Sequence, residues 1–118
     1  MAPPSQLSIA TSSIDRLLKE ESSYRLELAH QQNHLEKLQF GGPGGVEDVP
    51  GNSEFLVKQQ KQAIEETKAV FGPLRERIAA AVETLGTTLK SGAPMDDKQV
   101  AAANDAMGRA KATYYSMG

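Results

Sequence analysis

Apolar side chains recur in three segments of the chain at spacings that alternate between three and four residues. This alternation is typical of helices that pack along one continuous seam. The seam positions of the first segment, about residues 5–39, are Leu7, Ala10, Ile14, Leu17, Glu21, Tyr24, Leu28, Gln31, Leu35 and Leu38. Glu21 and Gln31 interrupt the apolar pattern, and such polar positions help to fix the register of packing.

The same spacing continues through two further segments, about residues 53–90 and 96–116. The seam positions of the second segment are Val57, Gln60, Ile64, Thr67, Phe71, Leu74, Ile78, Ala81, Leu85 and Thr88. Those of the third are Val100, Ala103, Met107, Ala110, Tyr114 and Met117. We expect Asp96 to cap the start of the third segment, because its carboxylate can accept hydrogen bonds from the first free backbone N–H groups.

Glycine and proline separate the three segments, in a long run at residues 41–51 and a short one at 91–94. Both runs have turn compositions. No stretch sustains the period-two alternation of a half-buried strand. The sequence therefore predicts an all-α fold, an antiparallel three-helix bundle with coiled-coil character, in which residues 1–118 form a single domain.

Pro73 falls inside the second predicted helix. Because proline has no N–H to donate to the carbonyl of Ala69 and its ring crowds that carbonyl, we predict a kink at Pro73. The apolar side chains that flank the seam also change sides there. They are Leu56, Ala63 and Val70 before the proline, and Val82 and Leu89 after it.

The third helix is predicted to be much shorter than the first two. It should therefore leave their far ends as a two-helix hairpin whose apolar flank has no third layer. Leu26 lies opposite the seam and has no evident core role. Such a half-covered hairpin is a candidate surface for binding another protein. Two alternatives are that Phe40, Val46 and Val49 fold over the hairpin, or that two molecules pair there.

Composition narrows the classes of partner. Lys and Arg number 13 against 15 for Asp and Glu, so the net charge is −2. A protein that binds nucleic acid through phosphate contacts normally carries a basic surplus, so we expect no nucleic-acid partner. The longest apolar run is far too short to span a membrane, and the first residues lack the pattern of a signal peptide. Cysteine is absent, which excludes thiolate chemistry. We expect a soluble intracellular protein.

Three sequence features are partly similar to a metal site, a phosphate-binding loop or a pair of catalytic carboxylates. Each lacks residues or a geometry that such a site requires. His30 and His34 have the spacing of two zinc ligands, but a third histidine and the catalytic glutamate are missing. The glycine-rich run lacks the Lys-Ser/Thr of a phosphate loop. The adjacent carboxylates Glu65–Glu66 and Asp96–Asp97 diverge on a helix and cannot converge on a substrate. We therefore expect a protein that is not an enzyme, with no catalytic residues, no cofactor and no metal site.

Two stretches resemble a known family. Residues 14–27 read IDRLLKEESSYRLE, and residues 58–78 read KQQKQAIEETKAVFGPLRERI. In this order, the two stretches resemble the first two helices of the tubulin-folding cofactor A family, also called tubulin-specific chaperone A. The first stretch shares the Arg-Leu-x-Lys-Glu pattern followed by Tyr. The second shares the Lys- and Gln-rich start and the internal proline. The resemblance covers about residues 5–90 and looks fungal in type. The glycine-rich loop and the alanine-rich third helix depart from it.

This resemblance implies a cytoplasmic, cytoskeleton-associated chaperone. It would capture and stabilise β-tubulin released from the cytosolic chaperonin and pass it to later tubulin-folding cofactors, for assembly of the α/β-tubulin heterodimer, without using nucleotide. The alternative is a generic coiled-coil scaffold or adaptor unrelated to tubulin. We expect a monomer or weak homodimer. The residues that we predict to contact the partner are Lys19, Glu20, Leu26, Glu27, Phe55, Lys58, Gln59, Glu66, Arg75 and Arg77.

Overall fold

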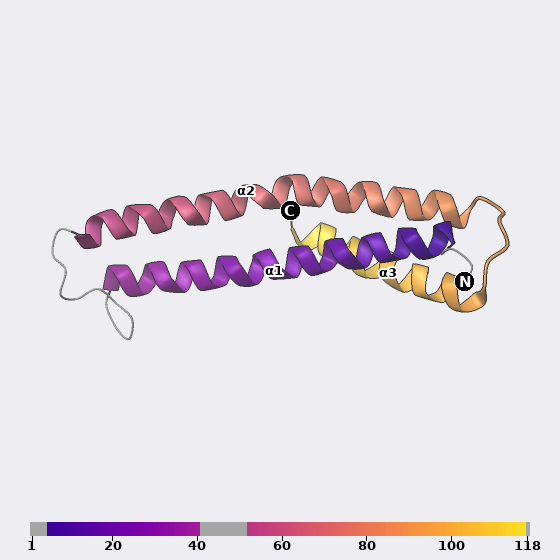
Figure 1. Ribbon diagram of the computed structural model, residues 1–118, viewed down its shortest axis with the longest axis horizontal. Helices are drawn as coiled ribbons and strands as arrows, with labels where there is room; N and C mark the ends of the chain where they lie inside the picture. Colours follow the sequence, from indigo (N-terminus) through magenta and orange to yellow (C-terminus); the bar gives the residue numbers. More distant parts are fainter. Residues whose placement is uncertain (1–4, 41–51, 118) are drawn as a thin grey trace. The chain divides into compact units, whose positions relative to one another are not determined.

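Three helices follow one another along the chain (Figure 1). The structure is a computed structural model that describes residues 5–40 and 52–117. In these residues it contains α1 (Gln6–Phe40), α2 (Asn52–Leu89) and α3 (Asp97–Ser116), and no strand. The all-α three-helix fold is confirmed, with each helix boundary within one residue of its predicted position. The expectations for Val46 and Val49 lie outside the described residues.

The turn between α2 and α3 confirms the predicted cap. The side chain of Asp96 accepts a hydrogen bond of 2.8 Å from the backbone N–H of Lys98. The φ of Gly92 is 78°, which is a left-handed conformation that glycine adopts without a steric penalty. Glycine and an aspartate cap therefore stop one helix and start the next within a few residues.

The chain folds into two compact units. The three-helix unit consists of the chain up to Glu21 together with residues from Pro73 onward, so it contains the first part of α1, the second part of α2 and all of α3. The two-helix unit, Ser22–Gly72, contains the remaining parts of α1 and α2.

The core of the three-helix unit follows the seam. Its buried residues, with one exception, are predicted seam positions, and the exception is Ala106. Leu85 has no exposed surface, and the polar seam residue Glu21 is only 3% exposed. The side that α3 turns toward the core is made of alanines, which let helices approach closely. The buried set is Leu7, Ala10, Ile14, Leu17, Glu21, Leu74, Ile78, Leu85, Ala103, Ala106 and Ala110.

The core of the two-helix unit is thinner. Only Leu38, Ile64 and Thr67 are buried among its described residues, and its other seam positions are half-buried. Two packed helices enclose only the line along which they touch, so this result is expected for a hairpin. A polar contact also joins the two helices, in which Gln60 Nε2 donates to the backbone carbonyl of Gln31 at 3.0 Å.

Helix α2 continues through Pro73 without interruption. The proline is exposed, so its ring lies at the surface of the helix rather than in the core. It is also the residue at which the three-helix unit resumes along α2, directly after the two-helix unit ends at Gly72. The kink at this position stays a prediction.

Candidate functional site

The two-helix unit exposes large apolar side chains. Leu26 on α1 is 60% exposed and Phe55 on α2 is 61% exposed, while Phe40 at the end of α1 reaches 81%. An open hollow near Phe40 is also lined by Leu38, Gln39, Glu54 and Val57. Large apolar side chains left exposed in one unit are candidates for contact with a partner.

The apolar flank of α2 in this unit is only partly covered. Leu56, Ala63 and Val70 are half-buried. In the three-helix unit, by contrast, Val82 lines a hollow together with Lys111 and Tyr114 of α3. Val82, on the later flank, therefore lies beside α3. The described residues of the two-helix unit supply no such helix for the earlier flank.

The ten predicted contact residues divide between the two units. Six lie in the two-helix unit and four in the three-helix unit, so the structure does not gather them into one described site. The six are all exposed, and they are Leu26, Glu27, Phe55, Lys58, Gln59 and Glu66. Within this set, Glu66 accepts a hydrogen bond of 3.5 Å from Gln62 Nε2.

Glu20 and Arg77 bridge α1 and α2 in the three-helix unit. A terminal nitrogen of Arg77 lies 3.3 Å from Glu20 Oε2, and both side chains are about half exposed. A solvated pair of this kind contributes at most about 1 kcal/mol to stability. Both groups therefore remain available for exchange with a partner's charges. Lys19, the neighbour of Glu20, is exposed.

Arg75 makes contacts inside the three-helix unit that the sequence did not predict. Its Nε donates to the backbone carbonyl of Tyr114 at 3.2 Å, and its guanidinium carbon lies 4.0 Å from the centre of the Tyr114 ring. This stacked arrangement combines a hydrogen bond with a cation–π contact and ties the end of α3 to α2. Among the predicted contact residues, Arg75 therefore has a clear structural role.

A second arginine joins α3 to α1. The guanidinium of Arg109 lies 2.9 Å from Asp15 on α1 and 2.9 Å from Asp105 on its own helix. The hydrogen bonds with Asp15 and then Asp105 raise the pKa of Arg109 above its ordinary value. Two arginine contacts thus hold α3 in register, one at Asp15 and the other at Tyr114.

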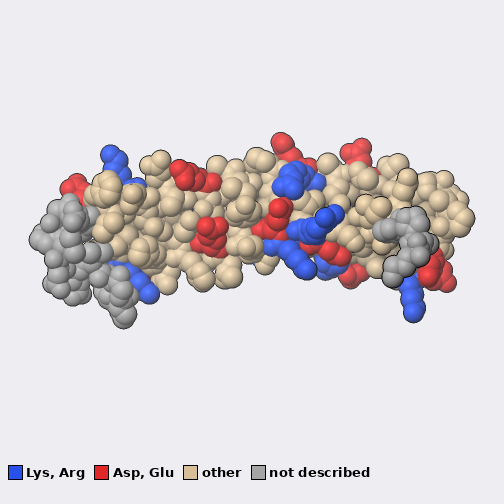
Figure 2. Space-filling model, viewed as in Figure 1, with Lys and Arg blue, Asp and Glu red and all other residues tan. Residues whose placement is uncertain are grey.

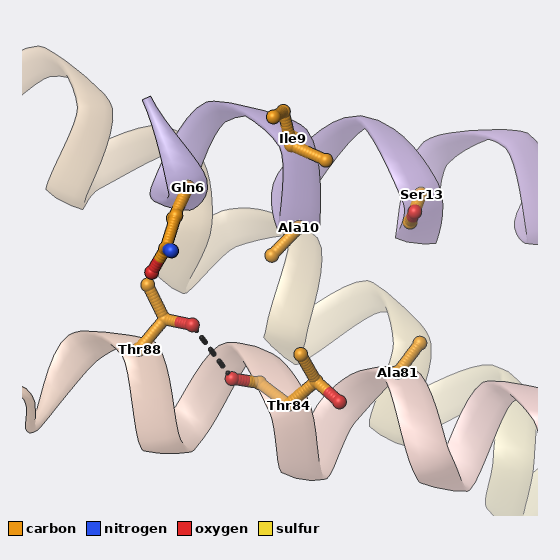
Figure 3. Close-up of a pocket in the computed structure, with 7 residues that line it drawn as sticks. All are labelled: Gln6, Ile9, Ala10, Ser13, Ala81, Thr84 and Thr88. Carbon is orange, nitrogen blue, oxygen red and sulfur yellow. Dashed lines mark hydrogen bonds between the residues drawn. The ribbon is translucent and has the colours of Figure 1, made fainter. Parts of the chain in front are cut away.

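An open groove runs between α1 and α2 of the three-helix unit. One hollow of about 320 Å³, shown in Figure 3, is lined by Gln6, Ile9, Ala10, Ser13, Ala81, Thr84 and Thr88. A second hollow is lined by Ser13, Arg16, Leu17, Glu20, Arg77, Ala80 and Ala81. The two hollows share Ser13 and Ala81, and we call them together the α1/α2 groove. Sequence reasoning missed it, because alanine, serine and threonine on a helix flank give no periodic apolar signal.

The structure gives no support to a metal site at the histidine pair. His30 and His34 are both exposed. The part of the chain that the structure describes contains no group of three or more metal-ligating side chains. None of its described helices is long and apolar enough to cross a membrane. Charges of both signs are interspersed on the face drawn in Figure 2, with no wide basic patch on that face.

Comparison with known proteins gives two matches. A family model described as tubulin binding cofactor A matches residues 2–107. The chain is also 32% identical over 88 residues to a protein of Saccharomyces cerevisiae named tubulin-specific chaperone A, an alignment that covers 75% of this chain and 76% of the yeast protein. No solved structure matches the chain significantly.

Proposed function

Because the chain belongs to the tubulin binding cofactor A family, we propose that it is a tubulin-folding chaperone that captures β-tubulin. The finding that carries this proposal is the family match, which spans nearly the whole chain. In the proposed cycle the chaperone receives β-tubulin after its release from the cytosolic chaperonin. It then passes β-tubulin to later cofactors, with which it makes transient contact in the cytoplasm.

The exposed side chains of the two-helix unit suit this role. Leu26 and Phe55 are solvated in the free protein, and burying such a side chain against a client contributes about 1.5–3 kcal/mol. Polar neighbours such as Lys58 and Gln59 can orient the client through hydrogen bonds and charge. A few apolar anchors within a polar surround give binding that is firm enough to shield the client and weak enough to release it.

Binding to β-tubulin tests the proposal directly. Radiolabelled β-tubulin released from the cytosolic chaperonin should co-migrate with the purified chain on a native gel, without added nucleotide. Lack of binding at micromolar concentration would contradict the proposal and favour a coiled-coil scaffold. Sedimentation at several concentrations adds a second readout, since a scaffold that works by oligomerisation would form stable multimers.

Charge reversal at Lys58 tests the polar part of the surface. The double variant Lys58→Glu with Gln59→Glu should weaken β-tubulin binding about tenfold, because buried or rim charges that meet the wrong sign cost on the order of 1–3 kcal/mol. Both side chains are exposed, so helicity and melting temperature should stay unchanged. The control is Lys61→Glu, an exposed position one turn further along α2 that is not among the predicted contact residues. Unchanged affinity of the first variant would show that Lys58 and Gln59 do not contact the client.

A further inference from the structure

We propose that the α1/α2 groove of the three-helix unit is the docking site for one amphipathic helix of the tubulin client, an inference that rests on the proposed function. The groove is built from flanks of α1 and α2 that α3 leaves uncovered. On α2, Val82 faces α3, whereas Thr84 and Thr88 line the groove. The close-up shows α1 and α2 facing each other across this space (Figure 3).

The walls of the groove suit a helix. Ala10, Ser13, Ala81 and Thr84 are all small, and small residues allow an approaching helix to reach the lower end of the usual interaxial range of about 8–10 Å. Ile9 lines the α1 side of the groove and is 51% exposed, although isoleucine is usually buried in folded proteins. A helix lying in the groove would bury Ile9 with its own apolar face.

The charges at one end of the groove indicate how the helix is oriented. Arg16, Glu20 and Arg77 line this end. Glu20 lies 3.3 Å from Arg77. This end of the groove therefore has two positively charged guanidinium groups and one carboxylate. An acidic side chain on the incoming helix would balance the remaining positive charge. The opposite end, near Gln6 and Thr88, is uncharged. The groove therefore fits a helix that is apolar on one face and acidic at one end.

The size of the groove argues for a single helix rather than a second copy of this chain. Its α1 wall runs from Gln6 to Glu20, a length of about 21 Å at a rise of about 1.5 Å per residue. At the width of one helix, about 10 Å, the footprint is roughly 200 Å². A stable protein interface buries about 800 Å² per partner. The groove alone is too small for a stable dimer but matches one element of a larger client.

Filling the groove tests the inference. Thr84 lines the groove and is exposed, so Thr84→Trp places an indole in the space without disturbing the core. Thr87 is also an exposed threonine on the same helix and does not line the groove, so Thr87→Trp is the matched control. Binding of chaperonin-released β-tubulin should weaken about tenfold for Thr84→Trp and less than about twofold for Thr87→Trp. Melting temperatures should show that both variants fold.

A photo-crosslinking amino acid at position 84 identifies the occupant. A crosslink to a helical segment of β-tubulin with an acidic residue near one end would support the inference. A crosslink to a β-tubulin loop or to a second copy of the chain would overturn it. Equal affinity of the two tryptophan variants would also overturn it, and the proposed function would stand as long as the wild-type chain binds β-tubulin. If the wild-type chain does not bind, both proposals are wrong. If Thr84→Trp does not fold, the crosslinker is placed at Ile9 and the same outcomes apply.

Discussion

Replacing Leu85 with alanine should lower the free energy of unfolding by about 2–5 kcal/mol. Leu85 has no exposed surface and lies at a seam position of the three-helix unit. The substitution removes three carbon atoms from a site where α1 and α3 also contribute buried side chains, so the space cannot close without moving a helix. Urea unfolding followed by far-ultraviolet circular dichroism measures the change as a shift of the midpoint.

The control for this prediction is the same substitution at a solvated leucine. Leu26 is 60% exposed, so Leu26→Ala should change the free energy of unfolding by less than about 0.5 kcal/mol. Similar losses at both positions would mean that the seam does not form the core. A large loss at Leu26 alone would mean that this residue packs against something in the free protein.

Placing aspartate at both Leu26 and Phe55 should abolish measurable capture of β-tubulin. Each position would lose an apolar contact worth about 1.5 kcal/mol or more, which corresponds to roughly tenfold in affinity. Each would also place a carboxylate in a contact that excludes water, which adds a desolvation cost. Together the two changes should weaken binding by about a hundredfold or more. Titration of labelled β-tubulin gives the affinity.

Stability provides the internal check for the double variant. Both side chains are more than half exposed, so the melting temperature should be unchanged. Tyr115→Asp serves as a matched variant in the three-helix unit, since Tyr115 is 76% exposed. It should leave affinity within about twofold, because one exposed side chain outside a binding site contributes little. Full affinity of the double variant would place the client contact away from Leu26 and Phe55.

The core could be predicted from the sequence because heptad spacing has one physical cause. Positions that alternate by three and four residues stay on one side of a helix. In agreement with this, the seam positions Leu7 and Ile14 on α1 and Ile78 and Leu85 on α2 are buried. Ala106 was missed, since alanine fits a buried face and a solvated one equally well. The exposure of Leu26 was also anticipated, because this residue lies opposite the seam.

Contacts between helices could not be predicted in the same way. The stacking of Arg75 on Tyr114 joins residues 39 positions apart, and nothing in either local pattern requires the pairing. The same is true of Arg109 and Asp15. An exposed arginine and an arginine that contacts a neighbouring helix look identical in sequence, so the structural role of Arg75 was not anticipated. The groove was missed for a related reason, since small residues mark a space only once two helices are brought together.

The thin core of the two-helix unit has a consequence for how a client is accommodated. With only Leu38, Ile64 and Thr67 buried among its described residues, this unit has few contacts that must break for its backbone to open locally. Its amide protons should therefore exchange with solvent through local opening of the helices. The amide protons around Leu85 should exchange only when the whole protein unfolds. A surface that deforms at low cost can adapt to a client whose own fold is still incomplete.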